Sequence, residues 1–115
     1  MAYFLTADGG TESLRARIYD LSGKELGSVA VAYKSDFSSG ARAEQDPADW
    51  WANFVKASRG AIAVAGINPS EIDAICYATT CCSVVALDQD GQALRPALIW
   101  MDVRANKEAD SVLAT

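Results

Sequence analysis

The first 33 residues constrain the fold most, because apolar and polar side chains alternate there in short segments that are separated by turn residues. A period of two is the period of a half-buried β-strand. The three segments are residues 2–7, 13–20 and 25–33. Between them stand Asp8-Gly9-Gly10 and Leu21-Ser22-Gly23-Lys24, which are typical of tight turns. The pattern predicts a three-stranded antiparallel meander.

Residues 34–43 are rich in Ser, Gly and Ala and are expected to form a loop, after which several helix signals gather. Asp46 is a suitable N-cap, Pro47 suits the first helical position, and Gly66 suits the C-cap. Apolar residues recur at spacings of three and four in between, which predicts a helix that covers one face of a sheet. The predicted face comprises Trp51, Phe54, Val55, Ser58, Ile62 and Ala65.

Residues 71–78 have the composition of a buried strand, and this strand is parallel to the first if the helix is a crossover connection. Residues 83–88 are expected to form another strand. The segment 103–115 is predicted to be helical but has no Gly or Asn cap at its end, which indicates a chain cut from something longer. The predicted fold class is α/β, with one mixed sheet.

Composition excludes several classes of function. A chain of 115 residues, half of them hydrophobic, is expected to fold as one domain. A net charge of −5 with no basic stripe argues against nucleic acid as a partner, and no apolar run is long enough to span a membrane. The three cysteines lie in one segment and there is no histidine, so we expect free thiols in the cytoplasm and no structural zinc site.

The turn between the first two strands carries residue types that suit a phosphate group. A carboxylate at a strand end can hold Mg²⁺ through water, glycine lets backbone N–H groups approach phosphate oxygens, and an arginine neutralises phosphoryl charge. The alternative is an ordinary glycine-rich turn with a surface arginine. The candidate phosphate residues are Asp8, Gly10, Thr11, Ser13 and Arg15, with Asp8 as the metal residue.

Four stretches in the same order resemble the FGGY carbohydrate kinases, which belong to the actin-like, ribonuclease-H-like ATPase superfamily. Asp-x-Gly-Thr-x-Ser-x-Arg at residues 8–15 resembles the first phosphate motif, and Glu44-Gln45-Asp46-Pro47-Ala48-Asp49-Trp50-Trp51 resembles the start of a helix in that family. Residues 85–96 resemble its hairpin and proline loop, and residues 98–105 resemble its I-L-W-x-D-x-R-A segment. The matches extend over nearly the whole chain.

The resemblance implies a truncated N-terminal sugar kinase domain over residues 1–115, of ribonuclease-H-like fold, without the C-terminal nucleotide-binding domain. It implies ATP-dependent phosphorylation of a sugar or polyol hydroxyl with Mg²⁺, and a possible homodimer in the full-length form. Trp100 and Asp102 would lie near the sugar, although core packing is an alternative for Trp100 and an ion pair is one for Arg104. The catalytic base, an Asp in this family, is expected downstream, so the fragment is expected to be inactive.

One departure bears on the substrate. Many members of the family have Gly-Gln-Met-His-Gly where this chain has Thr79-Thr80-Cys81-Cys82-Ser83. This stretch is similar to the branch that includes ribulose and ribitol kinases, which implies a pentulose or pentitol substrate near Cys82 and Ser83, in a xylulokinase-like or ribulokinase-like enzyme. Redox chemistry of the cysteine pair is disfavoured, because neighbouring strand residues face opposite sides. Alternative functions are a non-catalytic sugar-binding or regulatory module, and another actin-like kinase.

Overall fold

A computed structural model describes residues 2–114 of the chain. The chain forms two compact units. Unit 1 contains the residues up to Tyr33 together with Ala48–Thr80, and unit 2 contains Lys34–Pro47 together with the residues from Cys81 onward. Among the described helices, none is long and apolar enough to cross a membrane.

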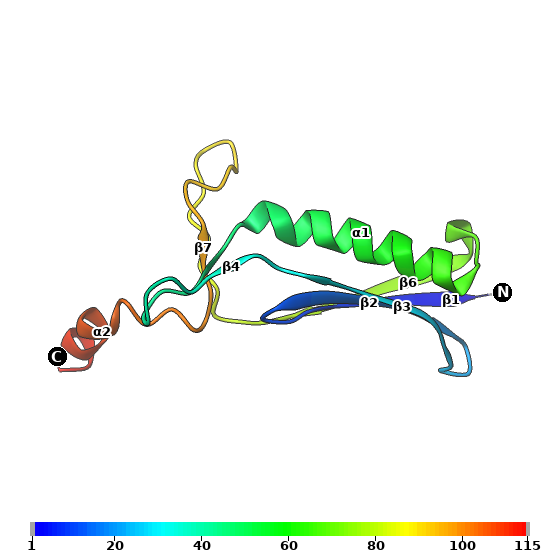
Figure 1. Ribbon diagram of the computed structural model, residues 1–115, viewed down its shortest axis with the longest axis horizontal. Helices are drawn as coiled ribbons and strands as arrows, with labels where there is room; N and C mark the ends of the chain where they lie inside the picture. The colour runs from blue at the N-terminus through cyan, green and yellow to red at the C-terminus, as the bar shows by residue number, and fades with distance from the viewer. Residues whose placement is uncertain (1, 115) are drawn as a thin grey trace. The chain divides into compact units, whose positions relative to one another are not determined.

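Unit 1 is a four-stranded sheet with a long helix on one face (Figure 1). The sheet has the order β3-β2-β1-β6, in which β1 and β2 pair antiparallel, β2 and β3 pair antiparallel, and β6 is parallel to β1. This arrangement confirms the predicted meander and the helical crossover. The elements are β1 (Tyr3–Gly9), β2 (Ser13–Asp20), β3 (Glu25–Ala32), α1 (Pro47–Ala65), the 3-10 helix η1 (Pro69–Glu71) and β6 (Ile72–Thr79).

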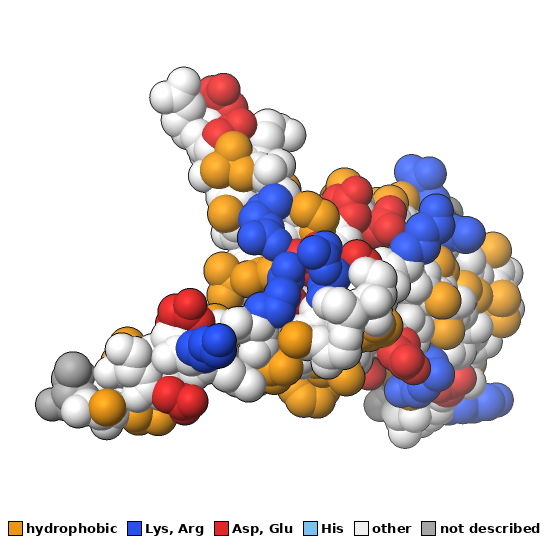
Figure 2. Space-filling model, turned by 60° about the vertical axis from the view of Figure 1, so that its left-hand side comes forward, with side chains coloured by type: hydrophobic (Ala, Val, Ile, Leu, Met, Phe, Trp, Pro, Cys, Tyr) orange, Lys and Arg blue, Asp and Glu red, His pale blue; other side chains and the backbone are white. Residues whose placement is uncertain are grey.

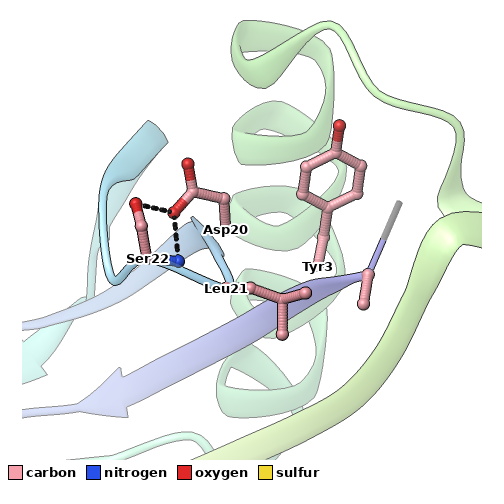
Figure 3. A pocket seen from close by; sticks show the side chains of 5 residues that line it. Tyr3, Asp20, Leu21 and Ser22 are labelled. Atoms are coloured by element: carbon pink, nitrogen blue, oxygen red, sulfur yellow. Dashed lines mark hydrogen bonds between the residues drawn. The ribbon is translucent and has the colours of Figure 1, made fainter.

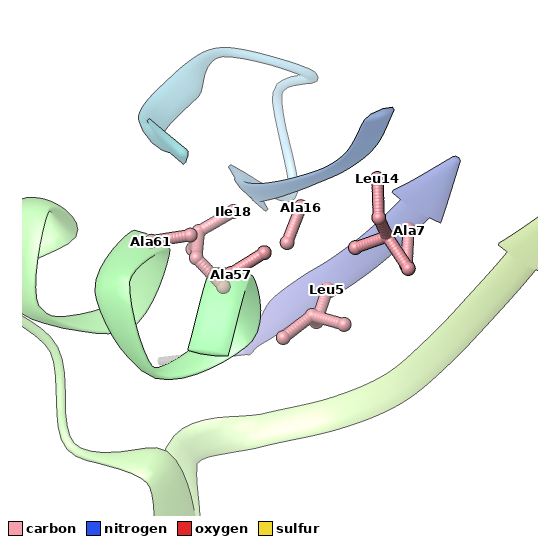
Figure 4. Packing of buried hydrophobic residues seen from close by; sticks show 7 residues of the cluster. All are labelled: Leu5, Ala7, Leu14, Ala16, Ile18, Ala57 and Ala61. Carbon is pink, nitrogen blue, oxygen red and sulfur yellow. The ribbon is translucent and has the colours of Figure 1, made fainter. Parts of the chain in front are cut away.

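The core of unit 1 lies between α1 and the sheet, and small residues line its helical side (Figure 4). Ala57 and Ala61 of α1 are fully buried, and Gly27 of β3 lies directly beneath the helix. A Cβ atom at Gly27 would lie 2.5 Å from the Ala61 carbonyl oxygen. The helix backbone therefore rests almost on β3. The buried cluster contains Leu5, Ala7, Leu14, Ala16, Ile18, Ala57 and Ala61.

Two predictions about burial in unit 1 are wrong. Trp51 was predicted on the buried helix face but is 68% exposed, and the buried residues of α1, Ala57, Ser58 and Ala61, lie further along the helix. The strand at residues 71–78 was predicted to be buried, but β6 is an edge strand on which Ile75 is 61% exposed. The helix α1 reaches this edge through Phe54, whose ring lies 5.4 Å from that of Tyr77, and it leaves Ile75 exposed.

Unit 2 contains a small sheet of order β4-β5-β7, built from β4 (Ser35–Asp36), β5 (Glu44–Gln45) and β7 (Ala97–Leu98), and the helix α2 (Asn106–Leu113). The predicted loop 34–43 thus contains one short strand. The strand predicted at residues 83–88 is wrong, because only Val84 and Leu87 form isolated bridges there. The turn after Asp88 is tight, since Gly91 has a φ of 77° and its N–H donates to the Asp88 carbonyl.

Candidate functional site

The candidate phosphate hairpin of unit 1, residues 8–15, has a closed backbone turn. The Gly10 N–H donates to the Ser13 carbonyl oxygen at 3.0 Å, so in this structure it already has an acceptor. The Tyr33 N–H donates to the Glu12 carbonyl oxygen at 2.8 Å, which ties the third strand to the turn. Both bonds hold the loop that carries Thr11 in a fixed shape.

Asp8 and Arg15 form a cross-strand pair at the base of this hairpin. Leu5, Ala7, Leu14 and Ala16 pack in the core beneath α1. Because side chains alternate along a strand, Asp8 and Arg15 face the opposite side of the sheet, and Ser13 shares the face of Arg15. Both charged residues are exposed. The structure thus places a carboxylate and a guanidinium on one open face of the sheet. Ser13 and Arg15 share a face of β2, as the sequence predicted.

Gly9 is the residue of the hairpin whose lack of a side chain matters most. Its carbonyl oxygen accepts the Thr80 N–H at 3.1 Å and the Thr79 hydroxyl at 3.2 Å. A Cβ atom at this position would lie 3.0 Å from the Thr79 hydroxyl oxygen and 3.1 Å from the Tyr77 hydroxyl oxygen. The end of β6 therefore packs directly against the end of β1, which fixes where Asp8 lies.

The pKa values of two tyrosines, Tyr33 and Tyr77, depend in part on the charge of Asp8. Burial raises the pKa of Tyr33 to about 12, and the charges of Tyr77 and Asp8 add to the effect. The pKa of Tyr77 is also raised, by burial first and then by Asp8. A phenol is neutral at physiological pH even at its ordinary pKa of about 10, and these shifts move the ionisation of both tyrosines further from that pH. The end of the hairpin therefore carries no tyrosinate charge that would oppose a phosphate.

Asp8 suits a metal ion that arrives with its substrate. In the part of the chain that the structure describes, no group of three or more metal-ligating side chains could hold an ion by itself. Mg²⁺ in phosphoryl-transfer sites is usually held by one or two carboxylates, with waters and substrate phosphates completing its shell. A single exposed carboxylate at a strand end fits this manner of binding.

The second turn of the meander carries a similar carboxylate in a different setting. Tyr3, Asp20, Leu21 and Ser22 line a pocket at the end of the sheet where β1 begins (Figure 3). One Asp20 oxygen accepts the Ser22 N–H at 2.8 Å, the Ser22 hydroxyl at 2.6 Å and the Lys24 N–H at 3.1 Å. Asp20 therefore stabilises its own turn, and it provides a natural comparison for Asp8.

Unit 2 contains a cluster of charges that sequence reasoning missed, which we call the arginine cluster (Arg42, Glu44, Arg95, Asp102 and Arg104). The Glu44 side chain is 5% exposed and accepts hydrogen bonds from three guanidinium groups. Arg104 lies 2.5 Å and Arg42 3.1 Å from its carboxylate, and Arg95 contacts the same oxygen as Arg104. Figure 2 shows blue Lys and Arg side chains gathered around red Asp and Glu side chains near the middle of the view.

Asp102 belongs to this cluster. Its carboxylate accepts Arg104 Nη2 at 2.7 Å, Arg104 Nε at 3.0 Å and the Ala43 N–H at 3.0 Å. These hydrogen bonds, that of Arg104 first, hold the pKa of Asp102 far below its usual range. Arg104 also lowers the pKa of Glu44, and both carboxylates raise that of Arg104. Arg104 thus forms ion pairs with Glu44 and Asp102, which was the alternative to ligand contact that the sequence left open.

Trp100 and the 81–83 segment are the other candidate substrate residues. The Trp100 side chain is 54% exposed, so it does not pack in a core of the described chain. Cys82 is exposed and Ser83 is half-buried. The prediction that Cys81 and Cys82 face opposite sides is wrong, because their sulfur atoms lie 3.7 Å apart. They follow β6 in a loop, where strand alternation does not apply.

Fold and hairpin together define a class of protein. An antiparallel meander, a helical crossover to a parallel strand, and an Asp-containing turn between the first two strands are features of the ribonuclease-H-like fold of actin-like ATPases. The structure of xylulose kinase from Rhodospirillum rubrum matches with a TM-score of 0.87 and 26% identity, over 97% of this chain and 23% of that chain. The predicted fold class is confirmed.

The chain belongs to the FGGY family of carbohydrate kinases, whose N-terminal domain it matches over residues 3–114. It is 28% identical to the xylulose kinase of Bacillus subtilis (strain 168) over 94% of this chain and 22% of that protein. It is 34% identical to the glycerol kinase of Roseobacter denitrificans over 90% of this chain and 21% of that protein. The chain thus spans about a fifth of the length of these relatives.

Proposed function

We propose that the full-length protein containing this chain transfers the terminal phosphoryl group of ATP to a hydroxyl of a pentulose or pentitol. The observation that carries the proposal is the Asp8–Arg15 pair, exposed on one face of the sheet beside a turn that is closed by its own backbone. A turn of this shape needs no charged pair for its stability, since the backbone bond between Gly10 and Ser13 closes it.

In this reaction each hairpin residue has a distinct task. Arg15 neutralises charge on the phosphate oxygens, and Thr11 and Ser13 offer hydroxyl donors from the same hairpin. Gly10 keeps the turn narrow, since a Cβ atom there would lie 3.3 Å from the Ser13 carbonyl oxygen. Asp8 orients the waters around a metal ion, and Mg²⁺, when bound with ATP, supplies additional neutralisation of the phosphates.

The proposed substrate residues lie in unit 2. The exposed indole of Trp100 offers a flat apolar surface to the C–H face of a polyol. Asp102 is already held by Arg104 and by the Ala43 N–H, so it fixes the turn after Trp100 in addition to any bond that it gives a sugar hydroxyl. The pentulose class is supported by the Thr79-Thr80-Cys81-Cys82-Ser83 stretch and by similarity to xylulose kinases.

A sugar-dependent ADP-release assay on the full-length protein tests the proposal. The substrates are pentuloses, pentitols, glycerol and gluconate, and we expect the highest kcat/KM for a five-carbon substrate. Replacing Asp8 by Asn should lower kcat by about 100-fold or more, as expected when an electrostatic group of the transition state is removed.

Asp20→Asn is the matched control, because Asn keeps an oxygen that can accept the bonds from Ser22 and Lys24. This variant should retain wild-type turnover. Sugar binding without any ATP-dependent turnover would instead support the sugar-binding module, and equal rates for the two variants would contradict a phosphate role for Asp8.

A further inference from the structure

Cys81 and Cys82 form an exposed pair of thiols in the loop after β6. The Cys82 thiol donates to the Cys81 sulfur, and the two sulfur atoms lie 3.7 Å apart. A disulfide bond is about 2.0 Å long, so the two sulfurs have to approach by roughly 1.7 Å to form one. The third cysteine, Cys76, is exposed on β6 but has no such neighbour in sequence.

The backbone of Cys82 favours this arrangement. Its φ is 62°, and no other residue except glycine has a positive φ between residues 2 and 114. Residues other than glycine rarely adopt the left-handed region, and those that do concentrate at functional sites. In an extended backbone the neighbouring side chains would point to opposite sides. The left-handed residue instead leaves both thiols on one side of the loop.

We propose that Cys81 and Cys82 are a vicinal dithiol site that a peroxide oxidises reversibly to a disulfide. The thiolate of one cysteine attacks a peroxide oxygen, which forms a sulfenic acid and releases the other oxygen as water. The sulfur of the second cysteine then attacks the first sulfur, forms the S–S bond and displaces the second oxygen as water. Two thiol protons and two electrons pass to the peroxide, so the step is balanced.

Either thiol can react first with the peroxide, because both cysteines are exposed and their sulfurs lie 3.7 Å apart. The pKa of Cys82 is raised, chiefly because its thiol donates to Cys81. Adjacent Cα atoms are about 3.8 Å apart, closer than in most disulfides, so the product is strained and easily reduced.

Oxidation would change the segment that includes Ser83. If the proposed function holds, this segment contributes to the sugar pocket, and we expect the disulfide to weaken sugar binding by about tenfold, the equivalent of one lost hydrogen bond. A thiol reductant should restore the affinity. The dithiol site itself does not depend on this consequence.

Intact-mass and peptide-mapping measurements on the reduced full-length protein, treated with increasing hydrogen peroxide, test the site. We expect the loss of two hydrogen atoms, located on the peptide that contains Cys81 and Cys82, and its reversal by dithiothreitol. Cys76→Ser should behave as the wild type, whereas Cys81→Ser and Cys82→Ser should each lose the reaction. Gain of oxygen at either cysteine without disulfide formation, or the same loss of hydrogen in Cys81→Ser, would overturn the proposal.

A second probe does not depend on the folding of any variant. A monosubstituted trivalent arsenical binds two neighbouring thiols together, and binding to the wild type should be one to one and reversed by a dithiol but not by a monothiol. Absence of this binding would overturn the site. Disulfide formation in a protein that shows no ATP-dependent turnover would overturn the proposed function and leave the dithiol site standing.

Discussion

At the scale of single residues, the two groups of charges in this chain differ in what they can do. Asp8 and Arg15 are exposed cross-strand neighbours. Glu44 and Asp102 are enclosed by guanidinium groups, with side chains 5% and 6% exposed. An enclosed carboxylate with all its partners in place stabilises structure, whereas an exposed pair is available to a ligand. The hairpin is therefore the site at which we expect chemistry.

The pH dependence of unit 2 follows from the arginine cluster. Because the pKa values of Glu44 and Asp102 are lowered in the folded state, their stabilisation is present above about pH 4, the usual carboxyl range, and is lost as the pH falls through the lowered values. We expect amide protection at Leu98 and Ile99, which bond to Val84 and Ala43, to fall in this window. Hydrogen exchange, corrected for intrinsic rates, measures it.

In Glu44→Gln, the Leu98 and Ile99 amides should be less protected from hydrogen exchange than in the wild type at pH 7. This difference in protection should shrink as the pH falls. Asp36→Asn is the matched control, since the exposed Asp36 carboxylate lies 3.5 Å from Arg42. It should remain close to the wild type. Unit 2 protection that stays constant from neutral to acid pH would contradict the assigned role of the cluster.

Sequence could predict the hairpin but not the cluster. Asp8, Thr11 and Arg15 lie within eight consecutive residues, so strand alternation and turn chemistry are sufficient to bring them together. Glu44 meets Arg95 and Arg104 only through the pairing of β5 with β7, across 51 and 60 residues of sequence. No local pattern encodes that contact.

At the scale of elements, the backbones of α1 and β3 lie almost in contact in unit 1. A Cβ atom at Gly27 would lie 2.5 Å and 2.7 Å from backbone atoms of Ala61 and Ala65. A helix backbone cannot move aside as a flexible side chain can. The periodicity of apolar residues predicted that α1 covers the sheet, but the separation of the layers depends on a glycine in a different element.

Gly27→Ala should therefore destabilise unit 1 by about 1–3 kcal/mol, the usual range for overpacking a filled contact. Urea unfolding followed by circular dichroism measures the loss. Gly40→Ala is the control, because a Cβ atom there meets nothing within 4 Å, and the change should stay within about 0.5 kcal/mol. If both variants unfold at the wild-type urea concentration, the packing described for α1 and β3 is incorrect.

At the scale of the whole molecule, the order of four motifs along the chain predicted the family before any contact was known. Those motifs include residues of both compact units. What the sequence could not predict is which apolar residues stay exposed, such as Ile75 on β6 and Trp100 in unit 2. An apolar residue tends to be buried, but composition alone does not say whether the residues that bury it belong to these 115.

Calorimetric titration of the full-length protein with ATP–Mg²⁺ and ADP–Mg²⁺ measures whether the hairpin holds the terminal phosphate of ATP. Arg15→Ala should weaken ATP binding by about 10-fold to 100-fold, the value of a charge-assisted hydrogen bond, with a smaller effect on ADP. Arg17→Ala, two residues along the same strand and paired with Glu25 at 3.4 Å, should bind both nucleotides as the wild type does. Unchanged ATP affinity in Arg15→Ala would contradict the account.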